Sequence, residues 1–154
     1  MPIHIIRHAE AVAEQPGLID EHRFLTRAGR DQARRLGQYL AAQQVALDTL
    51  YTSPLVRAVQ TAELIAVGIG YAGAIEVLMD LAPGGDLRAL AARIASAPHP
   101  MALVGHEPGL SALAGLLCGR SRFHPLDKAE AIRIEGGRAI WSLTPADPVP
   151  RPRE

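Results

Sequence analysis

Cationic and nucleophilic side chains stand where three apolar segments of this chain end. Arg7 and His8 close PIHIIRH, Arg57 lies in SPLVRAVQTAE shortly after LYT, and His106 and Glu107 follow MALVG. Guanidinium groups bind phosphate through paired hydrogen bonds and stay charged at any working pH. An imidazole can act as a nucleophile and carry a covalent intermediate. These residue types predict phosphoryl transfer, provided that the fold brings the three segments together.

Alternating apolar and helical patterns predict the elements that would position these residues. Strands are expected at 2–7, 47–52, 74–79 and 101–105, and a hairpin around Gly136 and Gly137 at 131–143. Helices are expected at 25–44, 53–68, 86–97 and 108–119, with Thr26, Ser53 and Asp86 as N-caps. The strands and helices therefore alternate along the chain until the hairpin.

This alternation predicts an α/β fold, a three-layer α/β/α sandwich with a mostly parallel sheet and a C-terminal antiparallel hairpin. Ligands bind outside the carboxyl ends of the strands in such sheets. Arg7, His8, Arg57 and His106 are expected to meet at that edge, where helix N-termini add a positive field. A backbone carbonyl there could hold one ring nitrogen of His8 and fix its tautomer.

Length and composition fit one soluble domain. The chain has 154 residues, 48% of them hydrophobic and 21% charged. We expect a domain over 1–143 and a Pro-rich tail over 144–154, TPADPVPRPRE, that frays because its prolines continue neither a sheet nor a helix.

The charge balance argues against nucleic acid or a membrane surface as a partner. Sixteen basic side chains match sixteen acidic ones. The single cysteine, Cys118, excludes an internal disulfide and fits a reducing compartment. The first residues lack the features of a secretory signal, so a cytoplasmic location is expected.

A metal site is not expected. His8, His106 and Glu107 could be imagined as ligands, but two fixed guanidinium charges would repel a divalent cation. The sequence also has no HxH, HExxH or cysteine cluster. We therefore predict a metal-independent site without a cofactor.

Four blocks of sequence, in this order, are similar to the histidine phosphatase superfamily: RHAE from Arg7, LTRAGRDQA from Leu25, SPLVRAVQTAE from Ser53 and VGHEPGLS from Val104. The chain most resembles its small SixA-like branch, the phosphohistidine phosphatases, through Ala9, its short length and KAEAIRI from Lys128.

The resemblance implies a phosphoglycerate-mutase-like fold without metal. It also implies that His8 becomes phosphorylated while Arg7, Arg57 and His106 bind the phosphoryl group. Ser53 lies near enough in sequence to touch phosphate as well, and Lys128 is a candidate for the mouth of the pocket.

The proton donor is where the chain departs from the superfamily pattern. Many members carry a carboxylate after the third strand, whereas this chain has MDLAPGGDLRAL with only Asp80 and Asp86 nearby. Asp86 is more simply explained as a helix cap. Glu107 stands where another branch has an acidic donor, but a carboxylate in the first turn of a helix also complements its dipole. Both readings of Glu107 remain open.

The missing donor favours a substrate whose leaving group needs little help. An alcohol requires a proton as it departs, whereas a phosphorylated imidazole has a weak P–N bond. The leading hypothesis is a phosphatase that acts on a histidine-phosphorylated partner protein through a phosphohistidine intermediate. The alternatives are a phosphomonoesterase that acts on a small metabolite, with Glu107 or Asp80 as acid, and a non-catalytic phosphate-binding module.

Overall fold

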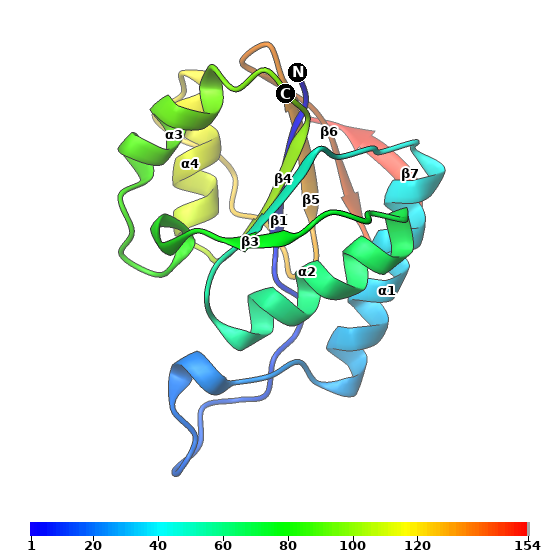
Figure 1. Cartoon of the computed structure of the whole chain (residues 1–154), viewed down its shortest axis with the longest axis vertical. Coiled ribbons are helices and arrows are strands. Elements are labelled where there is room, and N and C mark those ends of the chain that lie inside the picture. The colour runs from blue at the N-terminus through cyan, green and yellow to red at the C-terminus, as the bar shows by residue number, and fades with distance from the viewer. Residues whose placement is uncertain (154) are drawn as a thin grey trace.

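A seven-stranded mixed sheet forms the middle layer of the computed structural model, which describes residues 1–153 (Figure 1). Its strand order is β3-β2-β4-β1-β5-β6-β7. The first four strands pair in parallel and the last three add antiparallel pairing. The strands are β1 Ile3–Arg7, β2 Thr49–Thr52, β3 Ile75–Val77, β4 Met101–Gly105, β5 Ala131–Glu135, β6 Arg138–Thr144 and β7 Asp147–Pro152.

Helices cover both faces of this sheet, which confirms the predicted sandwich. In Figure 1, α1 and α2 lie on one side, and α3 and α4 lie on the other. The helices are α1 Arg27–Ala42, α2 Val56–Ile69, α3 Leu87–Ala95 and α4 Gly109–Cys118, with short 3-10 helices η1 Asp20–His22 and η2 Met79–Leu81. No described helix has the length and apolar character that crossing a bilayer requires.

The buried side chains of the central strands divide between two apolar cores. Ile6 packs with the α1 and α2 side, whereas Ile5 packs with the α3 and α4 side, and each is almost fully buried. Successive strand residues point to opposite faces, so a strand covered on both sides is apolar along most of its length. Burying a side chain of this size stabilises the fold by about 1.5–3 kcal/mol. These cores fix β1 rigidly at the centre of the sheet.

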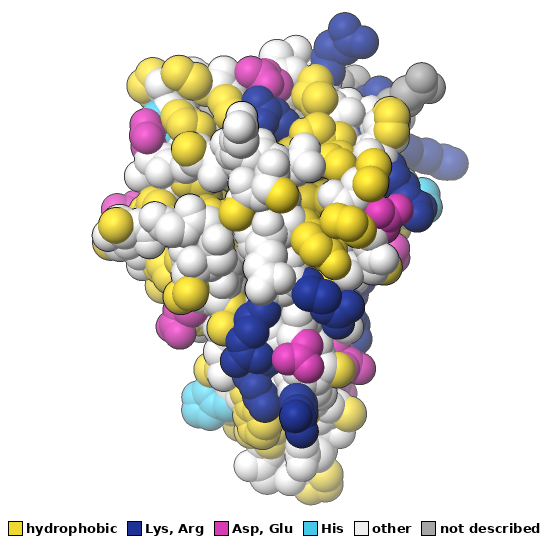
Figure 2. All heavy atoms as spheres, turned by 90° about the vertical axis from the view of Figure 1, so that its right-hand side faces the viewer, with side chains coloured by type: hydrophobic (Ala, Val, Ile, Leu, Met, Phe, Trp, Pro, Cys, Tyr) yellow, Lys and Arg dark blue, Asp and Glu magenta, His cyan; other side chains and the backbone are white. Residues whose placement is uncertain are grey.

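The outer face of α1 is strongly basic. Lys and Arg side chains gather in the lower half of the face shown in Figure 2, which is the side of the molecule that carries α1. Arg34 is paired with Asp31 at 3.2 Å, and both side chains are 54% exposed. An exposed pair of this kind contributes little to stability. This face is therefore a solvated helix surface.

Two of the three predicted helix caps are confirmed. The Thr26 hydroxyl accepts a hydrogen bond from the Gly29 amide at 2.9 Å, and the Asp86 carboxylate accepts one from the Ala89 amide at 3.0 Å. The prediction for Ser53 is wrong, because α2 begins at Val56 and Leu55 is its N-cap. The Ser53 hydroxyl instead accepts a local hydrogen bond from the Leu55 amide at 3.2 Å. Such short-range bonds compete with helix initiation.

The prediction of a frayed tail is also wrong for the described part of residues 144–154, and residue 154 lies outside the described residues. Residues 147–152 form β7, which pairs antiparallel with β6. In this pair Pro152 lies opposite Trp141, and Asp147 lies opposite Thr144. Proline lacks an amide donor, but an edge strand needs only one of its two sides for pairing. Because β7 is the last strand of the sheet, its prolines are tolerated there.

The end of the chain described in the structure holds a loop that borders the sheet. The Arg153 guanidinium forms an ion pair with Glu130, donates to the His124 carbonyl at 2.8 Å and lies over the Phe123 ring. Glu130 also accepts a hydrogen bond from the Asp127 amide at 2.8 Å. Arg153 therefore holds the segment 123–130, which leads into β5, against the end of the chain.

Replacing Arg153 is expected to destabilise the protein. Glu130 has only 6% of its side chain exposed, so Arg153→Ala leaves a buried carboxylate without its cationic partner. We expect the free energy of unfolding to fall by about 2–4 kcal/mol, as measured by urea denaturation.

The matched control is Arg151→Ala. Arg151 is 77% exposed and pairs with Asp147 at 3.7 Å, so its loss should change the free energy of unfolding by less than about 0.5 kcal/mol. Equal effects of the two substitutions would contradict the stabilising role of the Arg153–Glu130 ion pair.

Candidate active site

The register of the central strands brings the predicted residues to one edge. Arg7 lies opposite Gly105 in the parallel pair of β1 and β4, so the residues that follow each, His8 and His106, emerge side by side. The His8 amide donates to the Gly105 carbonyl at 3.0 Å. On the other side of β4, the Ser53 amide donates to the Val104 carbonyl at 2.9 Å, which places the start of the α2 connection at the same edge.

A cavity of about 260 Å³ opens at this edge. It is lined mainly by side chains that carry or can carry positive charge, together with one carboxylate. Its lining residues are Arg7, His8, Ala11, Arg23, Arg57, Pro83, His106, Glu107 and Lys128. The structure therefore brings together the predicted residues Arg7, His8, Arg57 and His106, and it confirms the placement of Lys128.

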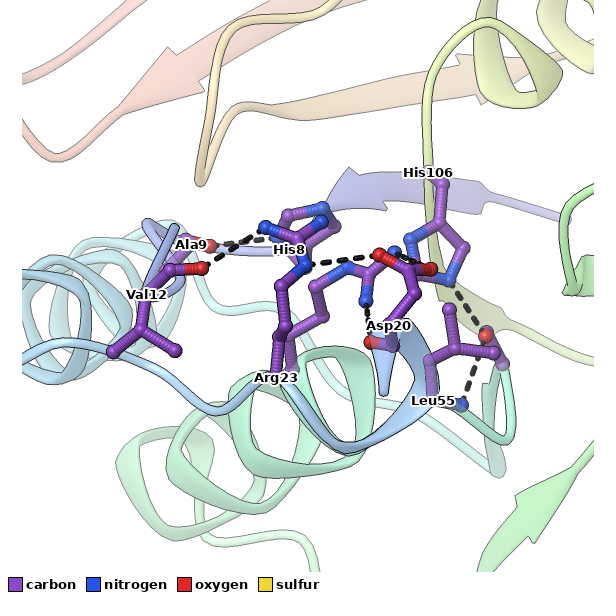
Figure 3. Close-up of polar contacts among 9 residues, drawn as sticks. His8, Ala9, Val12, Asp20, Arg23, Leu55 and His106 are labelled. Carbon is purple, nitrogen blue, oxygen red and sulfur yellow. Dashed lines mark hydrogen bonds and ion pairs between the residues drawn. The ribbon is translucent and has the colours of Figure 1, made fainter. Parts of the chain in front are cut away.

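The tautomer of His8 follows from its hydrogen bond. Nδ1 of His8 lies 2.7 Å from the Ala9 carbonyl oxygen (Figure 3). A carbonyl can only accept, so Nδ1 carries the proton and Nε2 keeps its lone pair. Burial lowers the pKa of His8 to about 4, against the Ala9 hydrogen bond and together with the charges of Arg57 and Arg7. Near neutral pH, His8 is therefore an uncharged imidazole with Nε2 available as a nucleophile.

His106 is held in the complementary orientation. Its Nε2 lies 2.6 Å from the Ser53 hydroxyl, which already accepts from the Leu55 amide and can donate its own proton to Nε2. Nδ1 of His106 then carries a proton, and it has no hydrogen-bond partner within residues 1–153. Burial and the charge of the neighbouring His8 lower the pKa of His106 to about 3. The ring centroids of His8 and His106 are 5.1 Å apart.

The two predicted arginines are held by backbone carbonyls. A terminal nitrogen of Arg7 donates to the Leu126 carbonyl at 2.8 Å, and one of Arg57 donates to the Asp20 carbonyl at 2.8 Å. In each guanidinium, Nε is buried and has no partner in the described part of the chain. Arg7, Arg57 and His106 all line the cavity, and the N–H groups of guanidinium and imidazole side chains are of the kind that binds the oxygens of a phosphoryl group.

The block SPLVRAVQTAE supports the loop that carries His8. The Thr61 hydroxyl accepts from the Ala9 amide at 3.1 Å and donates to the Arg57 carbonyl at 2.8 Å. The Gln60 side chain accepts from the Leu25 amide at 2.7 Å. One helix thus positions Arg57 and also holds both ends of the loop that joins β1 to α1.

The block LTRAGRDQA contacts Glu10, which lies two residues after His8 in the loop between β1 and α1. The Thr26 amide donates to the Glu10 carbonyl at 3.0 Å, and its hydroxyl donates to the Glu10 carboxylate at 2.8 Å. A Cβ atom at Gly29 would overlap the Glu10 carbonyl oxygen, so only glycine permits this approach. The sequence blocks are therefore explained by contacts that fix the backbone around His8.

The carboxylates considered as proton donors occupy different places. Glu107 lines the cavity, but its two oxygens accept from the Ser111 amide at 3.0 Å and the Ser111 hydroxyl at 2.6 Å. Asp86 caps α3, and neither Asp80 nor Asp86 belongs to the described cavity lining. Ser53 also lies behind His106 rather than in that lining, so its direct contact with phosphate stays a prediction.

Two residues at the site were not found from the sequence. Asp20 and Arg23 lie in the loop between β1 and α1, and their side chains reach the site beside His8 and His106 (Figure 3). Arg23 lines the cavity and pairs with Asp20 at 2.9 Å. The available signal was the i, i+3 spacing of an acidic and a basic residue, which places both on one side of a helical turn.

The geometry points to a class of protein. A neutral imidazole, two arginines and a second histidine at the carboxyl edge of an α/β sheet are the groups that phosphoryl transfer through a histidine requires. Within the described residues, no cluster of three or more His, Cys, Asp or Glu side chains is arranged to hold a metal ion.

The chain belongs to the histidine phosphatase superfamily (branch 1), whose family model matches residues 3–82. It is 29% identical to the phosphohistidine phosphatase SixA of Escherichia coli (strain K12) over 122 residues, which cover 77% of this chain and 74% of that protein. It is 33% identical to an uncharacterized protein of Picosynechococcus sp. over 145 residues, covering 90% and 87%.

Solved structures show the same fold. The protein histidine phosphatase SixA in complex with tungstate aligns with a TM-score of 0.86 and 25% identity, covering 95% of this chain and 98% of that one. The phosphoglycerate-mutase-like fold and the SixA resemblance expected from the sequence are thereby confirmed.

The two active-site histidines predict a specific dependence on pH. The unfolded chain takes up protons on these imidazoles near pH 6.5, whereas the folded pKa values are about 4 for His8 and about 3 for His106. The unfolded state therefore binds more protons between these values. We expect their NMR signals to titrate well below pH 6 and the free energy of unfolding to fall as the pH is lowered from 6.5 towards 4.

His8→Gln and His106→Gln assign the two NMR signals, and each should flatten the dependence of stability on pH in that range. Midpoints near 6.5 for both signals would show that the imidazoles are not buried in neutral form.

Proposed function

We propose that this superfamily hydrolase removes the phosphoryl group from phosphohistidine on a partner protein, with His8 as the covalent carrier. The observation that carries the proposal is the combination of a free Nε2 on His8 with two engaged carboxylates, Glu107 in the cavity lining and Asp20 beside it. Glu107 is bonded to Ser111, and Asp20 is bonded to Arg23 and Arg57. Among residues 1–153, the site offers a nucleophile and cationic donors, and the carboxylates of Glu107 and Asp20 are engaged by other side chains rather than free to protonate an alcohol.

In the first step, Nε2 of His8 attacks phosphorus as the P–N bond of the substrate breaks. The leaving imidazole departs as a neutral ring when its other nitrogen already carries a proton from solvent. Arg7, Arg57 and Nδ1–H of His106 stabilise the charge on the three transferred oxygens. Phosphohistidine therefore needs no general acid from the protein.

In the second step, water attacks the phosphorus of phosphorylated His8, and the proton that it loses passes to solvent or to the product phosphate. The ring of phosphorylated His8 carries a positive charge while Nδ1 keeps its proton. The Ala9 carbonyl accepts that proton in a hydrogen bond throughout and stabilises the charge. When the P–N bond breaks, His8 returns to its initial tautomer.

The surroundings of the cavity support a substrate larger than phosphate. A second cavity of about 320 Å³ adjoins it and shares Pro83, His106 and Glu107 with it. Apolar residues make up much of its lining, including Leu81, Leu87 and Leu110. An apolar surface next to a phosphate site suits a protein that presents its phosphorylated side chain among apolar neighbours.

Similarity to known proteins supports the same assignment. The Escherichia coli relative is named a phosphohistidine phosphatase, and the chain aligned with the tungstate complex is named a protein histidine phosphatase. The alignment with the tungstate complex covers 95% of this chain.

The proposal predicts a clear order in a substrate panel. The purified protein should dephosphorylate a histidine-phosphorylated carrier protein much faster than sugar or nucleotide phosphates. His8→Ala should lower this activity by at least about a thousandfold, since it removes the nucleophile. Release of inorganic phosphate is the measurement, and His99→Ala, outside the described cavity lining, is the matched control. Comparable turnover of esters, or full activity of His8→Ala, would contradict the proposal.

Glu107→Gln separates the two leading functions. If phosphohistidine leaves without a general acid, the substitution should change its turnover by less than about threefold, because Gln retains an acceptor for Ser111. If the protein is a phosphomonoesterase with Glu107 as acid, ester hydrolysis should be the main activity and should fall by about a hundredfold or more. The same preparations also test the phosphate-binding module, which would show binding without turnover.

A further inference from the structure

The Asp20 side chain pairs with two arginines, Arg23 and Arg57, that line the cavity beside His8. Its Oδ2 lies 3.2 Å from a terminal nitrogen of Arg57, and its Oδ1 accepts from Nε of Arg23 at 2.9 Å. The backbone carbonyl of Asp20 accepts from the other terminal nitrogen of Arg57 at 2.8 Å. Figure 3 shows the Asp20 carboxylate beside Arg23 and on the side of the site that faces His106. The Asp20 carboxylate thus uses guanidinium N–H groups that an anion in the cavity could otherwise bind.

The burial of the partners shows which of them can leave. The Arg57 side chain is 6% exposed, whereas the Asp20 side chain is 44% exposed. Asp20 belongs to η1, in the loop from β1 to α1 that extends beyond the sheet in Figure 1. The Asp20 side chain can therefore rotate into solvent while Arg57, a buried residue of α2, stays in the site.

The carboxylate is ionised at neutral pH. Partial burial raises the pKa of Asp20, but the hydrogen bonds from Arg23 and Arg57 outweigh it and hold the pKa below its usual value. Its negative charge acts on both guanidinium groups and opposes any dianion that enters the cavity.

This competition matters most for the product. Arg7, Arg23, Arg57 and Lys128 surround one small cavity, and such a group of cations would bind inorganic phosphate tightly after hydrolysis. An enzyme that binds its product tightly is slowed by release rather than by chemistry. An internal carboxylate that returns to the arginines would shift the balance towards release.

We propose that Asp20 is a positioning residue that competes with phosphoryl oxygens for Arg57 and Arg23 and thereby weakens the retention of inorganic phosphate. It keeps the guanidinium groups in place between turnovers and yields them to the phosphoryl group of the substrate. The inference rests on the proposed function only in requiring that the cavity binds a phosphoryl group.

The test compares phosphate binding by Asp20→Asn and by the unchanged protein, using calorimetry with inorganic phosphate and no phosphohistidine substrate. Two partly exposed ion pairs correspond to roughly a three- to tenfold change in the dissociation constant, which should fall in the variant. In turnover assays, inhibition by added phosphate should strengthen by a similar factor. Asp20→Ala should act in the same direction.

A purely structural role predicts the opposite sign. If Asp20 only braced Arg57, its loss would disorder that arginine and raise the dissociation constant for phosphate. Asp31→Asn is the matched control, because Asp31 pairs with Arg34 on the exposed face of α1, and it should leave phosphate binding unchanged. Unchanged or weaker phosphate binding by both Asp20 variants, with folding intact by circular dichroism, would overturn the inference.

The outcome is independent of the substrate. Tighter phosphate binding in Asp20→Asn would stand even if the natural substrate were a phosphate ester. Conversely, efficient phosphohistidine turnover by the unchanged protein, together with unchanged phosphate binding in Asp20→Asn, would refute the role of Asp20 and leave the proposed function intact.

Discussion

The chemistry of this site depends on the hydrogen bond from Nδ1 of His8 to the carbonyl oxygen of Ala9. Burial and two nearby guanidinium groups lower the pKa of the imidazole, and the Ala9 carbonyl decides which of its nitrogens holds the remaining proton. Without that acceptor, the single proton of the neutral ring could lie on Nε2. Nε2 would then lack the free lone pair that a nucleophile needs. The Ala9 carbonyl itself is fixed because the Ala9 amide is bonded to Thr61, on the helix that also carries Arg57.

Concentrating cations around a neutral histidine has a cost that the backbone offsets. Desolvated guanidinium groups are unfavourable unless their donors are satisfied. Arg7 and Arg57 each give one terminal nitrogen to a carbonyl, and Arg57 also meets the Asp20 carboxylate. The remaining donors stay available to a phosphoryl group. The arrangement thus gives each guanidinium protein acceptors while it stays at the cavity.

Much of this fold follows from local patterns in the sequence. The order of strands and helices, the Thr26 and Asp86 caps and the C-terminal hairpin could be predicted, because each depends on periodicity or on a cap within one segment. Ser53 failed as a cap because a tertiary partner, His106, and a local amide both engage its hydroxyl. The tail failed because the pairing of β7 depends on an edge that β6 leaves open, which no pattern in a Pro-rich segment reveals.

The site divides in the same way. Residues that directly follow strands could be placed from topology, since parallel strands end at a common edge. Asp20 and Arg23 lie in a loop without periodicity. Asp20 is placed by its contact with Arg57 of α2, and Arg23 reaches the cavity with a bond to the Val12 carbonyl. The tautomer of His8 was expected to depend on a backbone carbonyl, but which carbonyl serves is a matter of three-dimensional geometry.

The central claim is that His8 carries the phosphoryl group, and trapping that intermediate tests it most directly. The protein is mixed with a carrier protein bearing labelled phosphohistidine, quenched without acid within the first turnover, digested and mapped. The account predicts label on the peptide that contains His8, absent from His8→Ala. Turnover in the unchanged protein without any labelled His8 peptide, or label on His106 instead, would contradict it.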